Sequence, residues 1–150
     1  MVMWRAVEVV LRPIEQLRCR RNVRRALALH DRGEARSDGL TLVRVRNRLE
    51  IRWRSRDVHP WDAGVAPEGK AQLFQEQLAA NTEAAIFRLF DFLPQIDRID
   101  LQVLEPASDN IVLAGTVHRS ALADSRKLRS VGMRLRQLGV SFAPADYLRP

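Results

Sequence analysis

Apolar residues recur at helical spacing along one long stretch, Pro67 to Leu93, more regularly than anywhere else in the chain. Pro67 suits a first helical turn, where its missing N–H needs no partner, and Pro94 pushes the residue before it out of the α region. The inward stripe of this predicted helix is Ala71, Phe74, Leu78, Thr82, Ala85, Leu89 and Phe92, with Ile86 and Leu93 beside it. A stripe of this width predicts that the helix packs on a sheet.

A second apolar stripe lies roughly opposite the first on the same predicted helix: Leu73, Ala80, Ala84 and Phe87. Three interpretations are open. In the first, the N-terminal helix covers this side within the same chain. In the second, the stripe is a self-association surface, where the alanines allow close approach and Phe87 is the anchor. In the third, its members are singly exposed apolar residues. The second interpretation makes these four residues the candidate interface of a homodimer.

Two stretches alternate between apolar and polar residues, as strands with one buried face do. In residues 40–54 the alternation breaks at Asn47, which predicts a hairpin with its turn there. We expect one face of this hairpin to be apolar and to pack on the central helix. The opposite face would carry Arg44, Arg46, Arg52 and Arg54, together with Glu50. Residues 97–118 predict a second hairpin, whose returning strand is interior and contains Gly115, a residue that permits a bulge or a close approach.

The remaining stretches predict helices near both ends of the chain. A helix from Pro13 to about Asp31 has a narrow apolar strip beside a broad arginine face, and residues 1–11 form a short helix or a lead-in. Toward the C-terminus, Ser120 or Asp124 caps a last helix that Gly139 closes. Residues 139–150 then form a tail.

The predicted elements follow the order α-ββ-α-ββ-α. This order indicates an α+β protein with a mainly antiparallel sheet of four or five strands and helices packed on one face. A length of 150 residues predicts one domain spanning residues 1–150. Within it, residues 1–38 form a basic helical region and residues 139–150 the tail.

Arginine is concentrated in the first third of the chain. Residues 1–56 hold fifteen Arg and six acids, a net charge of +9, whereas residues 57–150 hold ten Lys plus Arg and twelve acids, a net charge of −2. Such asymmetry predicts an anionic partner, either nucleic acid or another polyanion. A solvated helix face and the codon bias of a GC-rich genome are the alternatives, although codon bias does not explain the position of the arginines. The candidate anion-binding residues are Arg20, Arg21, Arg24, Arg25, Arg44, Arg46, Arg52 and Arg54.

The loop over residues 57–64 gathers Asp57, His59 and Asp62 around a proline and Trp61. Two carboxylates and an imidazole can bind a metal or supply a general base. No recognised ligand spacing or catalytic motif accompanies them, and a turn held by a packed tryptophan is the common use of such a loop. We therefore assign no cofactor and no metal, and retain the three residues as candidates for a small metal-dependent or acid–base enzyme.

The single cysteine, Cys19, excludes an intrachain disulfide and indicates a reducing compartment. Charged residues interrupt the first twelve positions, which predicts neither a signal peptide nor a membrane span. We therefore expect a cytoplasmic protein. The favoured function is a non-enzymatic protein-interaction or assembly module that binds itself, as a homodimer, or another protein. Binding of nucleic acid or another polyanion through the arginines is the alternative, and the enzyme of the 57–64 loop is the third hypothesis.

Overall fold

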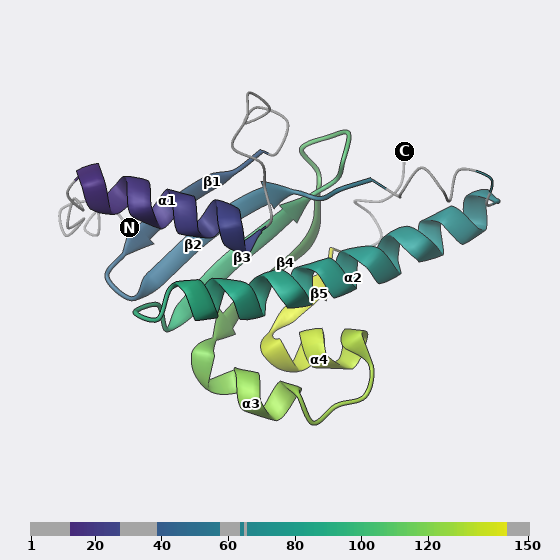
Figure 1. Ribbon diagram of the computed structural model, residues 1–150. Helices are drawn as coiled ribbons and strands as arrows, with labels where there is room; N and C mark the ends of the chain where they lie inside the picture. The colour runs from purple at the N-terminus through teal and green to yellow at the C-terminus, as the bar shows by residue number, and fades with distance from the viewer. Residues whose placement is uncertain (1–12, 28–38, 58–63, 65, 144–150) are drawn as a thin grey trace.

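The computed structural model describes residues 13–27, 39–57, 64 and 66–143 (Figure 1). The elements are α1 (Pro13–Ala26), β1 (Thr41–Val45), β2 (Arg48–Arg54), α2 (Pro67–Phe92), β3 (Arg98–Leu104), β4 (Ile111–His118), the 3-10 helix η3 (Arg119–Ala121), α3 (Leu122–Ser125), α4 (Val131–Leu138) and β5 (Val140–Phe142). The predicted order α-ββ-α-ββ-α is confirmed, and a short fifth strand follows it. Residues 1–12, the end of the predicted first helix beyond Leu27, and the tail beyond Ala143 lie outside the described residues.

The five strands form one mixed sheet in the order β1-β2-β3-β4-β5. Three of its pairings are antiparallel, whereas β2 and β3 run parallel. A parallel pair needs a long crossover connection, and α2 makes that crossover. The structure is therefore of the predicted α+β class, with a mainly antiparallel sheet.

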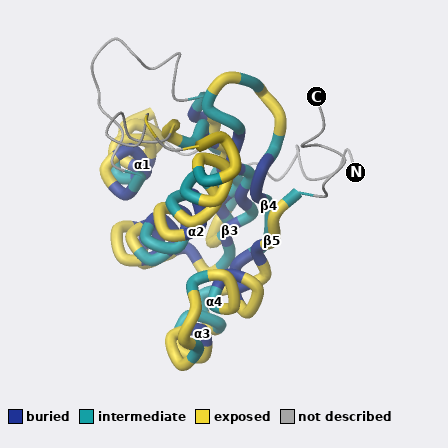
Figure 2. The backbone as a smooth tube through the Cα atoms, turned by 90° about the vertical axis from the view of Figure 1, so that its right-hand side faces the viewer, coloured by how far each residue is buried: buried dark blue, intermediate teal, exposed yellow. Residues whose placement is uncertain are grey.

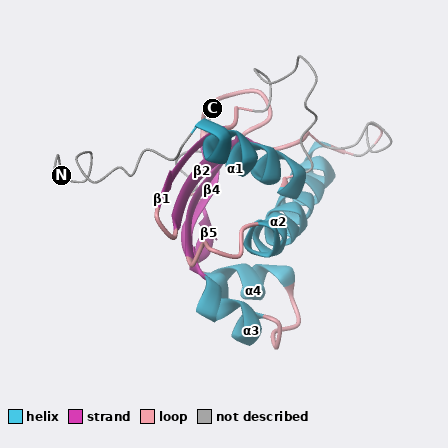
Figure 3. Ribbon diagram, turned by 60° about the vertical axis from the view of Figure 1, so that its left-hand side comes forward, coloured by secondary structure: helices cyan, strands magenta, loops and turns pink. Residues whose placement is uncertain are grey.

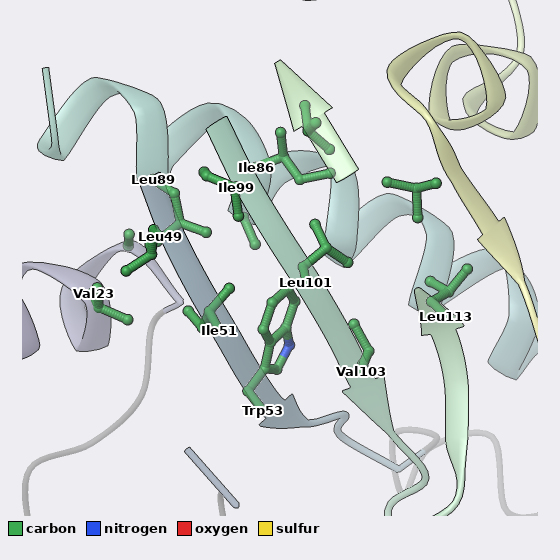
Figure 4. Close-up of a cluster of buried hydrophobic side chains, with 14 of the residues drawn as sticks. Val23, Leu49, Ile51, Trp53, Ile86, Leu89, Ile99, Leu101, Val103 and Leu113 are labelled. Atoms are coloured by element: carbon green, nitrogen blue, oxygen red, sulfur yellow. The ribbon is translucent and has the colours of Figure 1, made fainter. Parts of the chain in front are cut away.

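All of the longer described helices lie on one face of the sheet. Figure 3 shows the sheet nearly edge-on, with α1, α2 and α4 on the same side. Beneath them, alternate residues of adjacent strands form the core: Leu49, Ile51 and Trp53 of β2 and Ile99, Leu101 and Val103 of β3 (Figure 4). Val23 of α1 and Ile86 and Leu89 of α2 are completely buried against them. One buried layer therefore joins the helices to the sheet.

The central helix has the predicted limits. Pro67 occupies its first turn, and Leu93, just before Pro94, is its C-terminal cap. Only the middle and the end of the helix lie on the core, because its first turns extend beyond the sheet (Figure 1). None of residues 67–77 is buried (Figure 2). Ala71 is accordingly exposed, and 40% of Phe92 is accessible, so the inward stripe is shorter than its sequence pattern predicts.

The register of the first hairpin differs from the prediction. Arg46 and Asn47 make the turn, so Val45 pairs with Arg48, Arg44 with Leu49 and Val43 with Glu50. Directly opposed residues share a face of the sheet. The register therefore places Arg44 on the helix side with Leu49, and Val43 on the opposite side. The expectation that Arg44 shares a face with Arg52 and Arg54 is wrong, because the tight turn shifts the pairing by one residue relative to the expected alignment.

The predicted last helix is divided. Residues Leu122–Ser125 form α3 and residues Val131–Leu138 form α4. Ser130 lies between them with extended backbone and caps α4 by accepting a hydrogen bond from the N–H of Met133. Gly139 ends α4 as predicted, with a φ of 95° that favours glycine. The chain then turns directly into β5, so the predicted tail begins with a strand.

A close approach at Gly115 allows β5 to join the sheet. A Cβ atom at this position would lie 2.2 Å from the carbonyl oxygen of Gly139 and 2.7 Å from the Cα of Val140. Both neighbours are backbone atoms, which cannot rotate away. The predicted close approach at Gly115 is therefore confirmed, and its cause is the crossing of the α4–β5 turn over β4.

We predict that Gly115→Ala lowers the free energy of unfolding by about 1–3 kcal/mol, because the added methyl group must displace the backbone at Gly139. Gly132→Ala is the matched control, since a Cβ there meets nothing within 4 Å. Chemical denaturation followed by circular dichroism measures both variants. Equal stability of the two variants would contradict the close packing of β5 on β4.

Candidate functional site

The sheet face opposite the helices is not covered by any described helix (Figure 3). A hollow of about 520 Å³ extends over this open face from β1 to β4. Its lining includes Thr41, Val43, Arg52, Gln102 and Thr116. Val43 is 44% exposed, which is high for a valine in a strand. The open face thus combines an aliphatic edge on β1 with a polar centre.

Asp100 is the centre of the polar network on the open face. Its carboxylate accepts hydrogen bonds from Nε of Arg48 at 2.7 Å, from Oγ1 of Thr116 at 2.6 Å and from Nη2 of Arg98 at 3.2 Å. Arg48 also donates to Glu50 at 2.7 Å. Burial acts to raise the pKa of Asp100, but the hydrogen bonds from Thr116, Arg48 and Arg98 outweigh it and hold the pKa below its usual value. A carboxylate held in this way is a poor proton acceptor near neutral pH.

Because the folded-state pKa of Asp100 is lowered, this group stabilises the fold above its unfolded pKa of about 3.9, and the stabilisation is lost as the pH falls through the folded value. We predict that Asp100→Asn lowers the free energy of unfolding by about 1–3 kcal/mol at neutral pH. The difference from the native chain should shrink as the pH falls below about 4. Thermal unfolding at several pH values measures it, with Asp91→Asn, at an exposed site of α2, as control. A pH-independent difference would contradict the network.

The predicted anion-binding arginines do not form one patch. Arg24 is buried, with only 7% of its surface accessible. Arg54 is anchored to the β3–β4 loop, where it donates to the carbonyl oxygens of Glu105 and Ser108 and pairs with Asp109 at 2.6 Å. Arg25 lies over the ring of Phe92. Five of the predicted residues are exposed: Arg20, Arg21, Arg25, Arg46 and Arg52. Several of the predicted residues therefore have structural contacts within the chain.

Two further arginines hold the helical layer in place, and sequence reasoning missed both. Arg119 donates to the carbonyl oxygens of Phe90, Leu93 and Ile96 at 2.7–3.1 Å, at the C-terminal end of α2. Arg134 of α4 pairs with Glu83 of α2 through two bonds of 2.6 and 3.0 Å. Neither partner is near in sequence, so no local pattern indicates these contacts.

A second hollow, which we call the α1–α2 groove, lies on the helix side of the sheet and measures about 370 Å³. It is lined by Glu15, Arg18, Cys19, Asn22, Arg44, Phe92, Leu93, Pro94 and Gln95. Arg44 reaches it from β1 because of the hairpin register, and donates to Oε1 of Gln95 at 2.7 Å and to the carbonyl oxygen of Arg46 at 3.2 Å. The groove thus joins one arginine of the hairpin to the arginine face of α1.

Cys19 is a buried wall of the α1–α2 groove, with 3% of its surface accessible. Burial raises the pKa of the thiol, although the charge and hydrogen bond of Arg44 act to lower it. The thiol is therefore protonated at neutral pH and unreactive.

We predict that Ellman's reagent labels Cys19 slowly in the native protein at pH 8, and fully once the protein is unfolded in guanidinium. The control is the double variant Cys19→Ser/Ser141→Cys, which moves the single thiol to an exposed position of β5. Native Cys19 reacting as fast as the control thiol would show that the side of α1 that carries Cys19 does not pack on the core.

The residues of the second stripe of α2 do not share one covering element; different parts of the chain lie beside different residues of it. Arg126 lies over the ring of Phe87, 4.6 Å from its centroid. Ala84 lines a small hollow together with Leu27, which follows α1, and Ala80 is exposed. The C-terminal helices therefore contact one part of the stripe and the end of α1 faces another. Phe87 is partly covered within the chain, which leaves little apolar surface there for a second copy.

Of the three candidate metal-binding or acid–base residues of the 57–64 loop, Asp57 lies among the described residues. Its side chain is exposed, and the residue has an interaction partner within the chain. His59 and Asp62 lie outside the described residues. Within the described ranges, no group of three or more His, Cys, Asp or Glu side chains is arranged to hold a metal ion.

No helix in the described part of the chain has both the length and the apolar character needed to cross a membrane. Comparisons with protein-family models, with curated proteins and with solved structures find no match for this chain.

Proposed function

We propose that this protein is a non-enzymatic interaction module that forms a homodimer, and that the open face of the sheet is its contact surface. The observation that carries the proposal is that α1, α2 and α4 pack on one side of the sheet, while the other side offers a hollow face with a half-exposed Val43 on its edge strand. An uncovered sheet face that is bordered by an edge strand is a surface on which a second chain can associate.

The charges of the open face favour a second copy as the partner. Arg52 is exposed and has no hydrogen bond or ion pair to a described residue, whereas Glu50, on the same strand, is bonded to one arginine only. In a two-fold arrangement the same surface meets itself, so Glu50 of one copy can face Arg52 of the other. Such pairing of opposite charges gives specificity to a contact.

The chemistry of the face supports binding rather than catalysis. Asp100 is committed to Arg48, Arg98 and Thr116, and its lowered pKa makes it a weak base. The chain has a single cysteine and therefore no intrachain disulfide. We also place the protein in the cytoplasm, where thiols stay reduced. Binding of nucleic acid or another polyanion is the second candidate, supported by the exposed Arg20 and Arg21 of α1.

We predict a mass in solution of twice the 17.2 kDa of one chain, and dissociation to the monomer in Val43→Asp, because the new carboxylate would be buried against the partner copy. Sedimentation velocity at high micromolar concentration measures both. Met133→Asp is the matched control, since Met133 is 53% exposed on α4, away from the sheet, and should leave the dimer intact.

The variant Phe87→Asp distinguishes the two candidate surfaces. Dissociation by Phe87→Asp and not by Val43→Asp would move the interface to the second stripe of α2 and contradict the use of the open face. A native chain that is monomeric at high micromolar concentration would contradict the homodimer itself.

A further inference from the structure

We propose that the α1–α2 groove is a binding site for a phosphate group. The groove lies on the helix side of the sheet, between α1, the C-terminal end of α2 and Arg44 of β1. Its volume of about 370 Å³ is that of a site for a small ligand. Because the proposed dimer contact lies on the opposite face of the sheet, this inference does not depend on the proposed function.

The charge of Arg44 is the main reason to expect an anion. The side chain is half-buried, and its hydrogen bonds go to neutral acceptors, Gln95 and the carbonyl oxygen of Arg46. It forms no ion pair with a carboxylate of the described residues. A partly desolvated charge without a counter-ion is unfavourable, so an anion bound in the groove would stabilise it.

The other polar groups of the groove suit the same ligand. Arg18 supplies a second guanidinium, which is exposed and makes no ion pair to a described residue. Asn22 and Gln95 supply amide groups, and Oε1 of Gln95 already accepts from Arg44, so its N–H donors remain. Guanidinium groups bind phosphate through paired N–H donors. Among the described residues of the lining, Glu15 is the only carboxylate and Arg18 and Arg44 are the cations, so these residues together carry a net positive charge.

The position of Arg44 is fixed before any ligand binds. Its hydrogen bonds to Gln95 and to the carbonyl oxygen of Arg46 hold the guanidinium at the groove, beside the thiol of Cys19. Leu49, its cross-strand neighbour, is completely buried. Binding therefore needs little ordering of this side chain, which increases affinity. A third guanidinium, that of Arg25, lies 5.6 Å from the ring centroid of Phe92, another residue of the lining.

Isothermal titration calorimetry of the full chain with inorganic phosphate, at constant ionic strength, tests the proposal. We expect saturable binding that weakens by about tenfold or more in Arg44→Gln and in Arg18→Gln. Arg20→Gln is the matched control, because Arg20 is an exposed arginine of the same helix that does not line the groove. Glu15→Gln should strengthen binding severalfold, since it removes the one repulsive charge, and this gain cannot arise from misfolding.

A mononucleotide and a single-stranded oligonucleotide identify the source of the phosphate. Tighter binding of the mononucleotide than of inorganic phosphate indicates a phosphorylated small molecule. Tighter binding of the oligonucleotide, with a steep loss in salt, indicates the backbone of a nucleic acid. The proposal is overturned if none of the three anions binds, or if Arg44→Gln and Glu15→Gln leave their affinities unchanged.

Discussion

In the β1–β2 hairpin, Val45 pairs with Arg48 across the turn of Arg46 and Asn47, and this register decides what each face of the sheet presents. It places the outward side chains of β1 beside the charged residues of β2, on the open face. It also directs Arg44 toward the helices, where it reaches the end of α2. Because side chains alternate with a period of two, a shift of one residue would reverse both assignments. The two proposed surfaces therefore depend on the same cross-strand pairing.

Several arginines of the described residues stabilise this fold by binding carbonyl oxygens and carboxylates of distant segments. Arg119 satisfies carbonyl oxygens at the end of α2, where a helix leaves its last acceptors without partners. Arg134 joins α4 to α2 through Glu83, and Arg54 holds the β3–β4 loop. The planar, multiply donating guanidinium suits such roles better than the lysine ammonium. The high arginine content thus has a structural explanation at these positions, whereas the exposed arginines of α1 are not explained in this way.

Much of the fold can be predicted from the sequence, because local signals define it. Pro67 and Pro94 bracket α2, and the alternation of residues in both hairpins reveals the strands that α2 connects. The break between α3 and α4 could not be predicted, since the helical spacing of apolar residues continues across it and Ser130 is only one of several possible caps. The prediction of the register of the first hairpin was wrong for a similar reason. The apolar pattern of β1 fits either alignment, and the turn decides between them.

The open face and the α1–α2 groove could not be predicted from the sequence, because they depend on contacts between segments that are distant in the chain. Arg44 of the edge strand β1 donates a hydrogen bond to Gln95, which follows α2. Arg126, at the end of α3, lies over the ring of Phe87 of α2. Cross-strand proton contacts in the NMR spectrum of the native chain test the hairpin register most directly. The account predicts backbone contacts between Arg44 and Leu49 and between Leu42 and Ile51. Contacts that instead pair Val43 with Leu49 or Ile51 would turn the valines toward the helices and contradict it.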